Sequence, residues 1–326
     1  MTRAAVPTNV FLELNLECNL RCVQCDIYKL TNPPGELTLE ERCGVVAQVA
    51  DWHPDIRVVF AGGEPFLRRE TLYGVAEAAA ERGVYTTLST NGTLIRDVDI
   101  ERLPLSGVRC VVVSLDSDDP EVHDRIRGVP DTFRRATSAI RRLVEARDRT
   151  RADFSVLTST ILGSHNLDRV DAMVSCFEQL GVNTTIFQPI QPAFAREMTP
   201  RWWTTDPLFP RDASQVDRGI DQLIAARSAG RRVFQSDAGL EDIRYYFKNP
   251  RSLLAGQCAA MDRHLMVDML GDVRLCFNME RIGLRPVANV RTRSLRETWE
   301  AAEIEAVRST MRACREGCGS MLCHAR

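Results

Sequence analysis

The chain has 326 residues, of which 44% are hydrophobic and 26% charged, enough for one large α/β domain and a smaller one. Its formal net charge of −2 gives no electrostatic reason to expect binding to nucleic acid or to an anionic membrane. The chain has no apolar run of about eighteen residues, and its N-terminus lacks the apolar core of a signal peptide. We therefore expect a cytoplasmic protein, whose eleven cysteines indicate metal ligands more than disulfides.

The first 190 residues alternate between strand and helix patterns. Repeated β-α units of this kind predict a parallel sheet with right-handed crossovers. A Thr38 N-cap followed three residues later by Glu41 marks the start of the first helix. Strands are expected at 10–16, 56–60, 85–89, 109–114, 154–158 and 184–188, and helices at 38–50, 67–82, 131–148 and 167–180.

The pattern changes between residues 190 and 255, where five prolines interrupt the chain. Trp202, Trp203 and Asp206 lie in this connection, and a helix is predicted at 212–229. Aromatic rings pack on the C–H faces of sugars and a carboxylate can pair with an amine, so these three are candidate substrate contacts. The alternative is that the tryptophans only anchor the loop.

The last ninety residues form a second region, and we place the domain boundary between 1–235 and 236–326. A hairpin around Gly271 is expected from strand patterns at 264–268 and 272–275. One helix is predicted at 294–312. Five cysteines cluster here, at positions 258, 276, 314, 318 and 323.

Three cysteines near the N-terminus, Cys18, Cys22 and Cys25, have the spacing C-x3-C-x2-C. Three thiolates within so short a segment can converge on one metal centre, and soft sulfur ligands favour zinc or iron–sulfur clusters. Zinc usually takes four protein ligands, but the next candidates, Cys43 and His53, lie well beyond. Three thiolates on a four-iron cube would leave one iron open for another ligand.

This segment resembles the signature of the radical S-adenosylmethionine (SAM) superfamily. Further segments that resemble this family follow in order, each after a predicted strand: 61–65 (AGGEP), 88–92 (LSTNG), 113–116 (VSLD) and 123–128 (HDRIRG). The resemblance implies a partial (β/α)6 TIM-like barrel with its chemistry at the carboxyl ends of the strands.

The same resemblance implies that the three cysteines hold a catalytic [4Fe–4S] cluster which binds SAM. The residue before the third cysteine is usually aromatic in the family and packs near the adenine, but here it is Gln24. Short polar groups and glycines at the strand ends would bind the rest of SAM, with Glu64 on its ammonium group. The implied SAM-binding residues are Gly62, Gly63, Glu64, Ser89, Asn91, Ser114, Asp116 and Arg127.

The C-terminal cysteines resemble a SPASM or Twitch extension, a small α+β domain that carries auxiliary iron–sulfur clusters. A full SPASM domain has seven ligand cysteines, whereas this region has five, which implies one auxiliary [4Fe–4S] cluster and one spare thiol. Cys258, Cys276 and Cys318 are the expected ligands, and Cys314 and Cys323 compete for the fourth place. A zinc knuckle is the alternative.

The implied reaction is cleavage of SAM to a 5′-deoxyadenosyl radical, which abstracts a hydrogen atom from the substrate. A fully ligated auxiliary cluster would accept an electron, which predicts net oxidation by an oxidoreductase; a spare thiol that donates hydrogen would instead give an epimerase. About ten residues precede the first strand, so no N-terminal peptide-recognition domain is expected. We expect a sugar or aminocyclitol substrate from natural-product (antibiotic) biosynthesis, with a peptide maturase or a non-catalytic electron carrier as alternatives. Flavodoxin or ferredoxin would be the electron donor.

Overall fold

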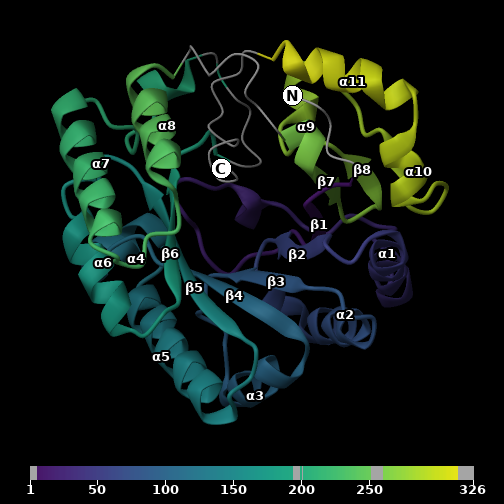
Figure 1. The fold of residues 1–326 in the computed structure, drawn as a ribbon, viewed down its shortest axis with the longest axis horizontal. Helices are drawn as coiled ribbons and strands as arrows, with labels where there is room; N and C mark the ends of the chain where they lie inside the picture. Colours follow the sequence, from purple (N-terminus) through teal and green to yellow (C-terminus); the bar gives the residue numbers. More distant parts are fainter. Residues whose placement is uncertain (1–5, 194–198, 200, 251–259, 315–326) are drawn as a thin grey trace.

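The computed structural model describes residues 6–193, 199, 201–250 and 260–314. Six parallel strands form the main part of an open sheet, with the spatial order β6-β5-β4-β3-β2-β1 (Figure 1). Every step from one strand to its neighbour is therefore a crossover of the same kind, as the β-α repeats predict. These strands are β1 (Asn9–Asn15), β2 (Arg57–Gly62), β3 (Thr86–Thr90), β4 (Val108–Ser114), β5 (Ser155–Leu162) and β6 (Thr184–Pro189).

Helices cover the outer, convex face of this sheet (Figure 1). The first begins as predicted: the Thr38 hydroxyl accepts from the Glu41 N–H, and the Glu41 carboxylate accepts from the Thr38 N–H. The outer helices are α1 (Leu39–Trp52), α2 (Arg69–Glu81), α3 (Asp97–Arg102), α4 (Pro120–Arg127), α5 (Thr132–Thr150), α6 (Val170–Gln179), α7 (Ala213–Ser228) and α8 (Asp237–Lys248). Short 3-10 turns are η1 (Ile27–Lys29), η2 (Pro65–Arg68), η3 (Leu103–Leu105), η4 (Trp202–Thr204) and η5 (Met279–Ile282).

The C-terminal strands extend the same sheet on the other side of β1. Strand β7 (His264–Val267) runs parallel to β1, and β8 (Asp272–Arg274) and β9 (Ala288–Asn289) follow in antiparallel order. The predicted hairpin around Gly271 is therefore present. The nine-stranded sheet is open and wraps into a partial barrel, with β7–β9 beside the first strand (Figure 1).

The predicted single helix at 294–312 is wrong. The chain forms α10 (Leu295–Glu300) and α11 (Glu303–Arg312), separated by Ala301 in an extended conformation with ψ 136°. The break brings Arg308 onto Trp299: its guanidinium lies 4.6 Å from the ring centroid and donates to the Trp299 carbonyl. Burial of both side chains requires this turn, which helical periodicity does not reveal. The four-residue helix α9 (Ala260–Arg263) precedes β7.

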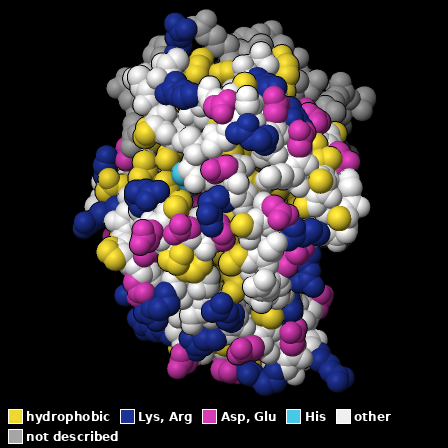
Figure 2. Space-filling view, turned by 90° about the vertical axis from the view of Figure 1, so that its left-hand side faces the viewer, with side chains coloured by type: hydrophobic (Ala, Val, Ile, Leu, Met, Phe, Trp, Pro, Cys, Tyr) yellow, Lys and Arg dark blue, Asp and Glu magenta, His cyan; other side chains and the backbone are white. Residues whose placement is uncertain are grey.

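Strand β1 shows how the sheet separates core from cavity. Val10, Leu12 and Leu14 are buried in the hydrophobic core, whereas Glu13 belongs to the opposite face because side chains alternate along a strand. On the exterior, positive and negative side chains are interspersed over the face shown in Figure 2, in keeping with the small net charge. Among the described residues, no helix combines the length and apolar character that a bilayer crossing requires.

Candidate active site

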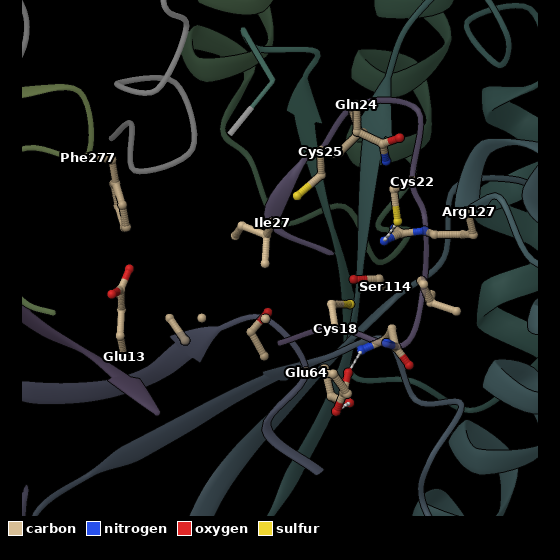
Figure 3. A pocket seen from close by; sticks show the side chains of 18 residues that line it. Glu13, Cys18, Cys22, Gln24, Cys25, Ile27, Glu64, Ser114, Arg127 and Phe277 are labelled. Carbon is tan, nitrogen blue, oxygen red and sulfur yellow. Dashed lines mark hydrogen bonds between the residues drawn. The ribbon is translucent and has the colours of Figure 1, made fainter. Parts of the chain in front are cut away.

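A cavity of about 290 Å³ lies at the carboxyl ends of the strands (Figure 3). All three N-terminal cysteines line it, together with seven of the eight residues expected to bind SAM: Gly62, Gly63, Glu64, Ser89, Asn91, Ser114 and Arg127. The eighth, Asp116, lies behind the lining and contacts Arg127. Segments separated by more than a hundred residues thus meet where a parallel barrel gathers its strand ends.

The cysteine loop is tied to the end of α4 by backbone hydrogen bonds. The Arg21 N–H donates to the Arg127 carbonyl at 3.1 Å, and the Val23 N–H donates to the Ile126 carbonyl at 2.9 Å. Gly128 is in the left-handed region (φ 70°), and a Cβ there would lie 2.1 Å from the Arg21 carbonyl oxygen. The glycine therefore permits the contact that orients the loop.

The three thiols fit the ligand set of an iron–sulfur cluster. Each is free, and burial raises the pKa of all three thiols, that of Cys18 to about 11. Across the described part of the chain, no three His, Cys, Asp or Glu side chains come close enough together to hold one metal ion. Thiols that share one cavity without meeting at a point suit separate corners of a cluster better than a single zinc ion.

Gly62 and Gly63 were expected to be glycine because they approach SAM, but the structure shows that they are required for close contact with the chain's own backbone. They line the cavity, but their missing side chains face the chain's own backbone: a Cβ would lie 2.1 Å from the Asn15 oxygen and 2.0 Å from the Glu17 oxygen, respectively. The Gly63 N–H donates to the Asn15 carbonyl and the Glu64 N–H to the Glu17 carbonyl, both at 2.8 Å. These bonds fix the segment that leads into Cys18.

Glu64 is completely buried at the start of η2. One carboxylate oxygen accepts from the Thr90 hydroxyl at 2.7 Å and from the Phe66 N–H at 3.1 Å; the other accepts from the Asn91 N–H at 2.8 Å. Burial raises the pKa of Glu64 even though these donors act in the opposite direction. A carboxylate has about four acceptor sites, so one remains for a further donor from the cavity.

Asp116 and Arg127 form a buried ion pair beside the cavity. Nε of Arg127 lies 2.8 Å from Oδ2 of Asp116, although its N–H is not aimed at that oxygen. Burial alone would raise the pKa of Asp116, but Arg127 and then His123 lower it. A terminal nitrogen of Arg127, Nη1, approaches the Cys22 sulfur at 3.9 Å. Asp116 therefore positions Arg127 beneath the cysteine loop.

Several lining residues were not predicted as site residues. Glu13 and Phe277 form one wall of the cavity, opposite Cys22 and Arg127 (Figure 3), and Thr90 and Ile161 also line it. A charged residue on the inner face of β1 was a usable signal for Glu13. Gln24 also lines the cavity; it is buried, and its Oε1 has no hydrogen-bond partner among the described residues.

Trp202, Trp203 and Asp206 lie in and after η4. Trp202 is buried and packs edge-on against Phe209, and Trp203 packs against Trp202. The Asp206 carboxylate accepts from the Leu208 N–H at 2.8 Å. None of the three is among the described residues that line the cavity, and these contacts are those of a loop anchor. Their contact with substrate stays a prediction.

The described part of the second cysteine group consists of Cys276, two residues after β8, and Cys314, two residues after α11. Cys258, Cys318 and Cys323 lie outside the described residues. Phe277, the neighbour of Cys276, lines the cavity and packs edge-on against Phe11 of β1, with ring centroids 5.0 Å apart. The C-terminal region thus supplies part of the cavity wall.

An open parallel barrel with three thiols at the carboxyl ends of its strands is typical of enzymes that bind an iron–sulfur cluster. Residues 13–176 match the family model of the radical SAM superfamily, and residues 258–320 match the SPASM iron–sulfur cluster-binding domain. The chain belongs to the radical SAM superfamily and carries a SPASM domain at its C-terminus. Its cofactors are accordingly SAM and two [4Fe–4S] clusters, as expected.

Two relatives in sequence align with most of the chain. The AdoMet-dependent heme synthase of Methanosarcina barkeri is 28% identical over 93% of this chain and 84% of its own length. The PqqA peptide cyclase of Xanthomonas axonopodis pv. citri is 28% identical over 93% of this chain and 77% of its own. Both relatives support the assignment of this chain as a radical SAM enzyme of the SPASM type. Their names, however, describe different reactions: heme synthesis and peptide cyclisation.

Solved structures share the fold at low identity. Streptococcus suis SuiB bound to precursor peptide SuiA has a TM-score of 0.72 at 15% identity, covering 97% of this chain and 72% of SuiB. BtrN in complex with AdoMet and 2-DOIA has a TM-score of 0.51 at 13% identity, covering 98% of this chain and 92% of BtrN. The predicted fold class, a partial barrel with a C-terminal cluster-binding domain, is confirmed.

Proposed function

We propose that this enzyme oxidises a side chain of a peptide substrate by abstracting a hydrogen atom. The observation that carries the proposal is the shared cavity wall: Phe277 adjoins the auxiliary-cluster cysteine Cys276 and lines the same cavity as Cys18, Cys22 and Cys25. A substrate between these groups lies near both cysteine sites. When bound, the cofactors supply a 5′-deoxyadenosyl radical for hydrogen abstraction and an auxiliary acceptor for the remaining electron.

The chain's own residues hold and orient the cofactors in this proposal. Cys18, Cys22 and Cys25 ligate the first cluster, and the free acceptor site of Glu64 receives the ammonium group of SAM. Arg127, held by Asp116, faces the SAM carboxylate. Ser89, Asn91 and Ser114 line the cavity as short hydroxyl and amide partners for the remaining polar groups of SAM.

The auxiliary cluster is proposed to have Cys258, Cys276 and Cys318 as ligands, with Cys314 or Cys323 as the fourth. A fully ligated cluster has no open iron for substrate and acts in electron transfer, which favours net oxidation. Epimerisation needs a thiol that reaches the substrate. Of the two candidates for the spare thiol, the structure describes Cys314, and it is not among the described residues that line the cavity. A flavodoxin or ferredoxin is the proposed electron donor.

A peptide substrate is supported by the sequence relatives and by the fold. PqqA peptide cyclases from three Xanthomonas strains are 27–29% identical over 93% of this chain, and SuiB was solved with a precursor peptide. The sugar or aminocyclitol substrate expected from the sequence is the second candidate, since BtrN shares the fold at a lower TM-score of 0.51. Both substrates suit the same chemistry.

Mass spectrometry distinguishes the two substrates. The anaerobically reconstituted, reduced enzyme is incubated with SAM and either short peptides encoded beside its gene or 2-deoxystreptamine as an aminocyclitol. Net oxidation removes two hydrogen atoms, about 2 Da, from the product, with one 5′-deoxyadenosine formed per turnover. Such a loss on a peptide supports the proposal, and a loss on the aminocyclitol alone replaces the peptide by the second candidate.

A further inference from the structure

Glu13 faces the cavity from strand β1. Its chain neighbours Leu12 and Leu14 are buried in the core on the opposite side of the sheet. Figure 3 shows the Glu13 carboxylate extending toward Phe277, on the side of the cavity away from Arg127. A carboxylate on the inner face of a barrel strand, next to the auxiliary-cluster region and outside the set that surrounds SAM, is placed to contact substrate.

The charges around Glu13 are predominantly negative. Asp268 and Glu280 act on it as like charges, and Arg274 is the opposite charge nearby. Arg274, however, already forms ion pairs with both of these acids. Three carboxylates therefore share one guanidinium. Burial, followed by Asp268, raises the pKa of Glu13 to about 7, although Arg274 and the Met269 backbone N–H act against the shift.

A half-buried carboxylate in such surroundings destabilises the fold when it is ionised, because its charge is incompletely solvated and incompletely compensated. Residues kept at that cost are commonly functional, since binding or catalysis needs the charge. A cation that enters the cavity would supply the missing compensation. An anionic substrate would not: Arg127 is the basic residue of the described lining, and it is paired with Asp116.

We propose that Glu13 is a substrate-binding carboxylate that holds a protonated amine of the substrate beside the SAM site. This proposal rests on the proposed radical SAM function and adds the chemical class of the group that is bound. The amine can belong to a lysine-type side chain or to an aminocyclitol, which share the ammonium chemistry. A substrate rich in carboxylates does not suit this wall.

The test uses reconstituted, SAM-loaded holoenzyme and isothermal titration calorimetry. Two matched probe pairs are compared: a capped glycine pentapeptide with a central lysine against its norleucine counterpart, and 2-deoxystreptamine against scyllo-inositol. The enzyme is tested as wild type, as Glu13→Gln, which keeps shape and removes the charge, and as Glu17→Gln. Glu17 is a matched control on the same segment, half-exposed and paired with Arg68 at 3.5 Å.

The wild-type enzyme should bind at least one amine probe about 10- to 100-fold more tightly than its neutral counterpart, as expected for one charge-assisted hydrogen bond. Glu13→Gln should abolish that preference, and Glu17→Gln should retain it. No preference in the wild type, or a preference that persists in Glu13→Gln, overturns the proposal. SAM cleavage measured in the same samples separates the two claims: its absence from the wild type contradicts the proposed function itself, whereas its presence without an amine preference contradicts only the role of Glu13.

Discussion

The two cysteine groups of this chain differ in how far their members lie apart in sequence. Cys18, Cys22 and Cys25 occupy one loop, so local backbone geometry brings them to one cavity. The second group extends from Cys258 to Cys323, and its described members follow two different elements, β8 and α11. A short motif therefore specifies the first site almost alone, whereas the second depends on tertiary packing of the whole C-terminal region.

Removal of one cysteine from the second group is the strongest way to test this difference. Cys276→Ala should lower the iron content of reconstituted protein from about eight to about four, because the auxiliary cluster loses a ligand. SAM cleavage in the absence of substrate should persist, since the first site is independent. Iron is measured by colorimetric assay and 5′-deoxyadenosine by chromatography. Cys43→Ala, outside both groups, is the control and should keep all the iron.

The same assay assigns the fourth auxiliary ligand. Of Cys314→Ala and Cys323→Ala, one should lose about four irons and the other none. If both variants keep the full iron content, the assumed ligand set is wrong.

The ion pairs near the two cysteine groups differ in burial: the Asp116–Arg127 pair is buried, whereas the Glu41–Arg291 pair is exposed to solvent. Asp116→Asn should therefore lower the free energy of unfolding more than any other single substitution considered. It leaves the buried Arg127 without its counter-ion, which costs about 3–5 kcal/mol of unfolding free energy. Glu41→Gln, which breaks the solvent-exposed pair between α1 and Arg291 of the C-terminal region, should cost much less, because water screens exposed charges. Urea unfolding measures both. Equal losses would mean that the Asp116–Arg127 pair has no special role in the cysteine-loop region.

Glu64→Gln should weaken SAM binding by about 1.5–3 kcal/mol, the value of one charged hydrogen bond, while the iron content stays unchanged. Equilibrium binding of SAM to the holoenzyme is the measurement. Glu17→Gln is again the matched control. An unaltered SAM affinity would mean that the Glu64 carboxylate only caps η2 and receives nothing from the cavity.

Glu13→Gln should give a pH-dependent gain in stability. Burial raises the pKa of Glu13 to about 7 in the folded protein, above the ordinary value of 4.5, so its protonated form stabilises the fold. That contribution is present below pH 4.5 and is lost as the pH rises toward 7. The variant should therefore gain about 1 kcal/mol relative to wild type between pH 6 and pH 8 in urea unfolding. A pH-independent difference would mean that Glu13 is solvated like a surface acid.

Sequence patterns predicted the six parallel strands to within a few residues, because a buried strand bounded by turns is a local signal. They also predicted most of the cavity lining, since each motif follows a strand and parallel strands end at one edge. Helices α3, α4 and α8 and the break at Ala301 were missed; the break depends on tertiary burial of Trp299 and Arg308, which a local pattern does not show. Glu13 and Phe277 were missed for the same reason: their meeting depends on β7 pairing with β1.

The central claim is that the N-terminal thiols hold a cluster that cleaves SAM. The direct measurement is 5′-deoxyadenosine formation by anaerobically reconstituted protein reduced with dithionite, compared with the Cys18→Ala/Cys22→Ala/Cys25→Ala variant. The wild type should cleave SAM, and the variant should retain about four irons on the auxiliary site but form no 5′-deoxyadenosine. Equal SAM cleavage by both proteins, or none by iron-loaded wild type, would contradict the central claim.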